Sequence, residues 1–245
     1  MTKSFWHEVY YSDLQSPYAL LVVPLAFLAW RAAVPTDESR ATVPDAARFV
    51  SGLTLFFAVA TLIDPLSTGP LLRTELLEDS FATTLIPFFF VLLGDLRVLW
   101  LAIGVARPER GLIRNLGWAL GTALIVPVLA GVGYEITRWF VPDLHGQVLW
   151  MIHEFGFFVL CLFLSRVWVP LNLRYEPTRA SFLRALFGFS AAYYALWLIA
   201  DLFIVVGDLD LGWAIRIVPN QLYYSFWVPF AYWRFFSETS GKAVR

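Results

Sequence analysis

Seven long apolar segments constrain the fold of this chain more than any other feature of its sequence. A helix that crosses a bilayer needs about 20 mostly apolar residues, because each residue rises about 1.5 Å and the hydrocarbon core is about 30 Å thick. Polar loops separate the seven segments from one another. The expected spans are residues 17–33, 49–64, 81–106, 115–136, 147–169, 182–206 and 213–236.

The composition agrees with a membrane protein. The chain is 59% hydrophobic and 15% charged, with a mean hydropathy of +0.65, whereas a soluble domain carries about 25% charged residues. We therefore predict an all-α integral membrane protein, a single seven-helix domain over residues 1–245, in the lipid bilayer of the cytoplasmic (plasma) membrane. The net charge of −1 gives no electrostatic footprint for nucleic acid, so no nucleic-acid partner is expected.

The basic residues predict the orientation of this bundle. Twelve of the 18 Lys and Arg residues fall in alternate loops and the C-terminal tail, and only three fall in the loops of the opposite side. Basic residues near helix ends are retained in the cytoplasm, so we expect an extracytoplasmic N-terminus and a cytoplasmic C-terminus. The twelve are Arg31, Arg40, Arg48, Arg107, Arg110, Arg114, Arg174, Arg179, Arg184, Arg234, Lys242 and Arg245, and the three are Lys3, Arg73 and Arg138.

Polar residues cluster in the outer halves of the expected spans. Ionisable groups inside a membrane span are costly and usually face the bundle interior, so they are functional candidates by default. Counted from the helix ends, five different spans place polar groups at this depth. They predict a polar cavity or ion pathway that opens toward the extracytoplasmic face, formed by Asp64, Glu135, His153, Glu154, Asp201, Arg216, Asn220 and Gln221.

His153 and Glu154 form the centre of this set, and three interpretations remain open for them. The imidazole titrates near neutral pH, which suits a proton relay or a solute site. With Asp201 and Asp64, the pair also offers the imidazole and carboxylate donors of a divalent metal site. Alternatively, neighbouring helices satisfy both side chains, which then serve only in packing. Adjacent helical residues point about 100° apart, so the two need not share a ligand.

A second polar pair, Asp95 and Arg97, is predicted deeper in the third span. At a spacing of two residues their side chains point nearly opposite ways and do not readily pair with each other. Arg166 in the fifth span has a comparable predicted depth, so the sequence favours an Asp95–Arg166 ion pair, with Arg97 extending toward the inner headgroups. This inner pair either locks the helices together or forms an inner gate.

Proline and glycine suggest local features in two spans. Pro219 is expected to kink the last span beside two amides, Asn220 and Gln221, which can hydrogen-bond a ligand. Gly117 and Gly121 in the fourth span are predicted to allow close approach of a neighbouring helix.

No cofactor is identified by the sequence. Covalently bound retinal is excluded, because the Schiff base needs a lysine in a span and the two lysines, Lys3 and Lys242, lie outside all seven. The chain also lacks the serine-hydrolase elbow, the His-Glu-Xaa-Xaa-His zinc motif and the phosphate-binding glycine loop.

Three functions fit these features. The leading hypothesis is a small-solute or proton/ion-coupled transporter or binding protein that uses the outer cavity. The first alternative is an integral membrane enzyme acting on a lipid or isoprenoid, with His153 and Glu154 as acid–base or metal-binding groups. The second alternative is a non-catalytic scaffold or pigment- or quinone-binding subunit of a larger membrane complex. It is motivated by 22 Phe and 11 Trp and implies other membrane subunits as partners.

Overall fold

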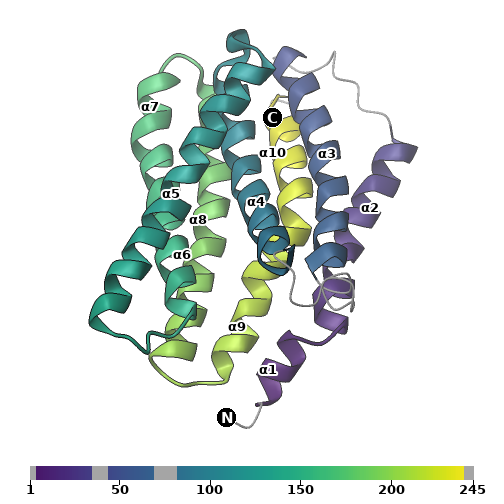
Figure 1. The fold of residues 1–245 in the computed structure, drawn as a ribbon. Coiled ribbons are helices and arrows are strands. Elements are labelled where there is room, and N and C mark those ends of the chain that lie inside the picture. Colours follow the sequence, from purple (N-terminus) through teal and green to yellow (C-terminus); the bar gives the residue numbers. More distant parts are fainter. Residues whose placement is uncertain (1–3, 35–43, 69–81, 240–245) are drawn as a thin grey trace.

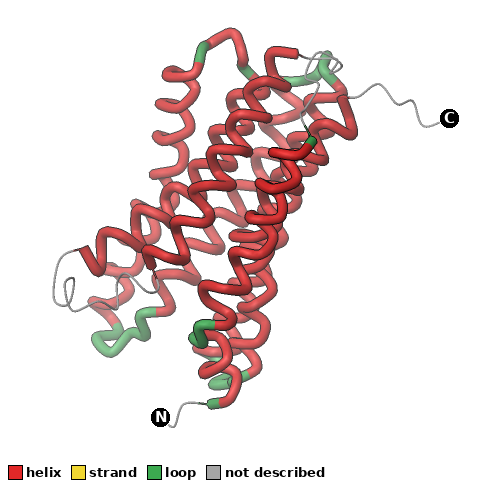
Figure 2. Tube along the Cα trace, turned by 90° about the vertical axis from the view of Figure 1, so that its right-hand side faces the viewer, coloured by secondary structure: helices red, strands yellow, loops and turns green. Residues whose placement is uncertain are grey.

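A computed structural model describes residues 4–34, 44–68 and 82–239, and within these ranges the chain is helical and contains no strand. Long helices run up and down side by side, with α1 at one end of the bundle and the end of α10 at the other (Figure 1). Figure 2, seen at 90° to this view, shows loops and turns gathered at the two ends. The charged residues Lys3, Arg40, Arg73, Lys242 and Arg245 lie outside the described residues.

In the described part of the chain the helices form seven rods preceded by a short N-terminal helix, and three of these rods contain or adjoin a π-helical segment. The elements are α1 (Phe5–Tyr10), η1 (Leu14–Tyr18), α2 (Ala19–Ala33), α3 (Pro44–Thr68), α4 (Ala82–Ala106), η4 (Pro108–Arg110), α5 (Leu112–Phe140), α6 (Gln147–Phe163), η5 (Leu164–Trp168), α7 (Val169–Asn172), α8 (Pro177–Val205), α9 (Leu211–Asn220), η6 (Gln221–Phe226) and α10 (Trp227–Thr239). Of these, η1, η5 and η6 are π-helical and η4 is a 3₁₀ turn.

Five stretches among the described residues are long and apolar enough to cross a membrane. They are Asp45–Ser67, Phe88–Ala106, Leu112–Phe140, Gln147–Asn172 and Pro177–Val205. Two expected spans are not in this group: α2 is apolar but only 15 residues long, and the last rod, from α9 through η6 to α10, carries more polar residues. The all-helical, apolar architecture is therefore confirmed, while the count of seven membrane spans stays a prediction.

The outer surface of the bundle is itself apolar. Leu112–Phe140 has a mean hydropathy of 1.8 in its most apolar window, yet only 22% of that window is buried inside the protein. Large side chains such as Trp118, Ile125 and Leu129 are more than half exposed. A soluble monomer rarely exposes so much contiguous apolar surface. The apolar helices therefore indicate a protein embedded in a membrane.

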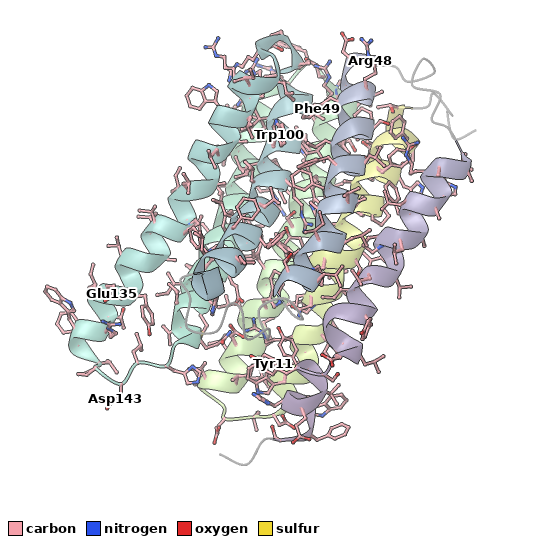
Figure 3. All side chains as sticks on the ribbon, turned by 45° about the vertical axis from the view of Figure 1, so that its right-hand side comes forward. Tyr11, Arg48, Phe49, Trp100, Glu135 and Asp143 are labelled. Carbon is pink, nitrogen blue, oxygen red and sulfur yellow. The ribbon has the colours of Figure 1, made fainter. Side chains whose placement is uncertain are left out.

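The arginine-rich loops share one end of the bundle. Arg48 lies at that end, whereas Tyr11, Glu135 and Asp143 lie at the opposite end (Figure 3). The α4–α5 and α7–α8 connections are at the same end as the start of α3 (Figure 1). This arrangement agrees with the alternation of the basic loops along the chain. The side of the membrane that each end faces stays a prediction of the charge distribution.

The glycines of α4 and α5 differ sharply in their surroundings. A Cβ atom on Gly94 of α4 would lie 1.5 Å from the Tyr223 hydroxyl oxygen, so only glycine lets this ring pack against α4. In contrast, a Cβ atom on Gly117 or Gly121 would meet nothing within 4 Å among the described residues. The prediction of close helix packing at Gly117 and Gly121 is therefore wrong within this chain, because both lie on the exposed face of α5.

We expect Gly94→Ala to destabilise the protein by about 2 kcal/mol, because the added methyl group must displace a buried tyrosine ring. The control Gly117→Ala adds the same group in open space and is expected to be neutral or stabilising by about 0.5–1 kcal/mol, since alanine favours helix. Unfolding of the purified variants in detergent measures both effects. Equal destabilisation by the two substitutions would contradict the packing of Tyr223 against α4.

Candidate functional site

A cavity of about 190 Å³ lies within the bundle, toward the end that carries α1. Its walls come from α1, α4, α6, α8, α9 and η6. Five of its lining residues are charged groups, imidazole or amide: Asp95, His153, Glu154, Arg216 and Asn220. Six more are aromatic: Tyr10, Trp150, Tyr194, Trp197, Tyr223 and Tyr224.

Helical spacing explains why these side chains meet. Residues three and four apart lie on one face of a helix. This spacing relates Trp150, His153 and Glu154 in α6, and Tyr194, Trp197 and Asp201 in α8. The same spacing relates Arg216 to Asn220 in α9, and the face continues into η6 with Tyr223 and Tyr224. Three helices thus turn one face each toward the same space.

The turn from α9 into η6 positions the last of these faces. Pro219 has no N–H group and cannot continue the regular hydrogen-bond ladder, and the π-helical segment begins two residues later. Within this segment the backbone carbonyl of Tyr223 accepts a hydrogen bond from Arg97 Nη2 at 2.5 Å. The guanidinium carbon of Arg97 lies 4.2 Å from the Tyr223 ring centroid and 4.7 Å from that of Trp227.

Arg216 and Asp201 form a buried ion pair beside the cavity. Arg216 Nη1 donates to Asp201 Oδ1, and Gln147 Nε2 donates to Asp201 Oδ2 at 2.7 Å. Asp201 is completely buried. A second amino group of Arg216, Nη2, lies 4.0 Å from Glu154 Oε1. Arg216 therefore sits between two carboxylates, but its short contact is to Asp201.

Asp95 lies opposite this pair and contacts α6 and α8. The Tyr194 hydroxyl donates to Asp95 Oδ1, and His153 Nε2 lies 3.1 Å from Asp95 Oδ2. This second contact has the distance of an ion pair, although it lacks the alignment of a hydrogen bond. Asp95 and His153 are 1% and 6% exposed. The two side chains form the most deeply buried acid–base pair of the cavity wall.

The structure does not form the expected Asp95–Arg166 pair. Arg166 lies in η5 and is exposed, while Asp95 is at the level of His153, which precedes Arg166 by more than three turns of helix. Residue counts from the helix ends placed Asp95 too deep, because the rods differ in length and do not begin in one plane. Arg97 does not extend to a headgroup region either, since it is buried against Tyr223.

Asn220 connects the N-terminal helix α1 to the cavity wall through hydrogen bonds. Its Oδ1 accepts a hydrogen bond from Trp197 Nε1 at 2.8 Å, and its Nδ2 donates to the Tyr10 hydroxyl at 3.1 Å. Arg216 Nε donates to the same hydroxyl at 3.4 Å. Through Tyr10, α1 becomes part of the wall at this end of the cavity.

Three residues of the expected outer cavity lie elsewhere. Glu135 is exposed and pairs with Arg138 at 3.4 Å, and Figure 3 shows it on the outer side of α5. Asp64 is buried, but with Arg97 it lines a separate cavity of about 10 Å³. Gln221 Oε1 accepts a hydrogen bond from the Ser225 hydroxyl at 2.9 Å and does not line the larger cavity.

The metal interpretation gains no geometric support. Across residues 4–34, 44–68 and 82–239, no three His, Cys, Asp or Glu side chains are grouped closely enough to hold a metal ion. Glu154 and Asp201 instead share Arg216, and His153 contacts Asp95.

Asp210 caps the first turn of α1 from a distant part of the chain. Its carboxylate accepts hydrogen bonds from the Ser4 hydroxyl and from the N–H groups of Trp6 at 2.9 Å and His7 at 3.1 Å. Desolvation raises the pKa of Asp210, but these hydrogen bonds and the charge of His7 outweigh it, so the pKa is lowered from its ordinary value. The ionised carboxylate therefore holds α1 against the loop before α9.

The six aromatic residues of the cavity wall are not among the site residues that the sequence predicts. One signal for them was available. Tyrosine and tryptophan carry a hydroxyl or N–H group that needs a partner when buried. In this chain, Tyr194 and Trp197 stand seven and four residues before Asp201, on one helical face. Aromatic residues at this spacing from a buried acid are the pattern that identifies the site.

Comparison of the chain with protein-family models, with curated proteins and with solved structures finds no match. The chemistry of the cavity therefore has to be inferred from its own geometry.

We expect Asp210→Ala to release α1, with amide-exchange protection of residues 5–11 falling about fivefold at neutral pH, as for the loss of one helix cap. Asp143→Ala, an exposed acid at the same end, is the control and should change nothing. Because the pKa of Asp210 is lowered in the folded protein, its stabilisation is complete above about pH 5 and is lost as the pH falls through the lowered pKa. Unchanged protection in Asp210→Ala would contradict the capping role.

Proposed function

We propose that this protein is a seven-helix carrier or binding protein of the cytoplasmic membrane, which admits a small solute from the extracytoplasmic side and couples its occupancy to a proton. The cavity within the apolar bundle supports this proposal. Its position toward the α1 end corresponds to the outer face that the basic loops predict.

The main support for proton coupling is the balance of charged groups around the cavity. Two carboxylates, Asp95 and Glu154, line it together with Arg216 and His153, and Arg216 is already paired with the buried Asp201. Uncompensated charge inside a membrane bundle is expensive. A proton in the empty site therefore reduces the excess of negative charge and stabilises it. A solute that brings its own charge or hydrogen bonds changes this balance and displaces or recruits a proton.

A membrane enzyme is the second candidate, and the His153–Asp95 contact favours it. An imidazole held by a carboxylate is a common general base. However, the described residues that line the cavity include no serine, threonine or cysteine nucleophile and no metal cluster. Acid–base groups without a nucleophile suit proton exchange better than acyl or phosphoryl transfer.

The proposal is tested with purified protein in liposomes that contain a pH-sensitive dye. Four probes of different charge are added outside: choline, lactate, glycine and glycerol. We expect at least one probe to cause proton movement above that of protein-free liposomes. Glu154→Gln should reduce this movement by at least tenfold, because it removes the acid whose proton the solute displaces.

Glu135→Gln is the matched control, since it makes the same change on the exposed face of α5 and should transport normally. Proton movement that is absent with all four probes, or that is unaffected by Glu154→Gln, would contradict proton-coupled solute uptake through this cavity.

A further inference from the structure

We propose that the solute of the cavity is a small organic monocation, of the alkylammonium type, held between Glu154 and aromatic rings. This inference rests on the proposed function and specifies its substrate class. Two independent features of the cavity support it: an unpartnered buried carboxylate oxygen, and walls that are half aromatic.

The unpartnered oxygen is Oε2 of Glu154. It is fully buried and accepts no hydrogen bond from any described residue, while the whole side chain is only 5% exposed. The neighbouring carboxylate of Asp201 takes its donors from Arg216 and Gln147. A buried acceptor without a donor costs free energy. The missing partner is therefore a cation or a donor that enters from the cavity.

An anionic solute would need a free cationic anchor, and the cavity does not offer one. The guanidinium of Arg216 donates to Asp201 and to the Tyr10 hydroxyl and lies near Glu154. Arg97 is directed to the Tyr223 carbonyl and to two aromatic rings behind the wall. Both arginines are thus occupied, and two acids, Asp95 and Glu154, line the cavity against the one arginine Arg216.

The walls match a cation that carries apolar substituents. Six of the twelve lining residues are Trp or Tyr. Aromatic faces attract cations through the ring quadrupole, and aromatic cages are the common solution for ammonium groups without N–H donors. Tyr223 already holds the Arg97 guanidinium on its ring, 4.2 Å from the centroid. The volume of about 190 Å³ is below the usual range for drug-sized ligands, so the cation has few heavy atoms.

The test compares two probes of the same shape. Choline carries a trimethylammonium group, and 3,3-dimethylbutan-1-ol replaces its nitrogen by carbon and is neutral. Both are titrated into purified wild-type protein by calorimetry, with the fluorescence of the lining tryptophans Trp150 and Trp197 as a second readout. We expect choline to bind with a dissociation constant at least tenfold lower than that of the neutral isostere.

Two substitutions separate the contributions of charge and aromatic surface. Glu154→Gln should weaken choline binding at least tenfold without changing the affinity of the isostere. Tyr224→Leu should weaken choline binding about threefold to thirtyfold, in line with a desolvated cation–π contact. The controls are Glu135→Gln and Tyr175→Leu, which alter an exposed acid and a tyrosine that is 87% exposed; both should bind choline as the wild type does.

The outcomes distinguish this inference from the proposed function. Equal affinity for choline and its isostere, or choline binding that survives Glu154→Gln, would overturn the cation assignment. If lactate, glycine or glycerol drives proton movement in the liposomes while choline does not bind, the proposal of a proton-coupled carrier is supported and the assignment of a cationic substrate is wrong. If none of the four probes moves protons in the liposomes and choline does not bind the purified protein, both proposals fail.

Discussion

The buried ion pair between Arg216 and Asp201 is the contact on which the rest of the site depends. It joins the end of α8 to the start of the last rod, with Asp201 completely buried and the Arg216 side chain 13% exposed. Removing one partner would leave the other charge buried and uncompensated, at a cost of about 3–5 kcal/mol. Because Asp201 engages Arg216 closely, Glu154 keeps only a contact at 4.0 Å. The pair thereby fixes the helices and leaves one acid available to a solute.

Arg216, together with Asn220, also connects the cavity to the N-terminal helix. Arg216 and Asn220 both donate to the Tyr10 hydroxyl, and Asp210 caps α1 through three donors near its first turn. The short helix that forms the wall at this end is therefore held both by these polar contacts and by the Trp213 ring, which packs against His7, Tyr10 and Tyr11.

The sequence predicted the helical, apolar architecture because hydrophobic segments and loop arginines are local signals. It also singled out His153, Glu154, Arg216 and Asn220, since a polar residue in an apolar run is conspicuous. It placed Asp95 too deep and paired it with Arg166, because a depth counted along one helix ignores how neighbouring helices are offset. The predicted site also included Glu135. Whether this side chain faces the bundle interior or its outer surface depends on the rotation of α5 about its own axis, which a single sequence does not determine. Among the aromatic residues of the wall, Tyr194 and Trp197 carry a sequence signal in their spacing from Asp201. For the other rings, packing decides which of the 11 Trp and 10 Tyr face the cavity.

The central claim is that a polar cavity opens toward the end of the bundle that carries α1. Val91→Cys in a Cys161→Ala background places the one thiol of the chain in the cavity wall, because Val91 is a lining residue and Cys161 is the one native cysteine. A membrane-impermeant thiol reagent is applied to vesicles of each orientation, with Asp143→Cys and Glu109→Cys as controls for the two ends. We predict that Val91→Cys reacts from the same side as Asp143→Cys and that choline slows the reaction. Reaction only from the Glu109 side, or no reaction from either side, would contradict the account.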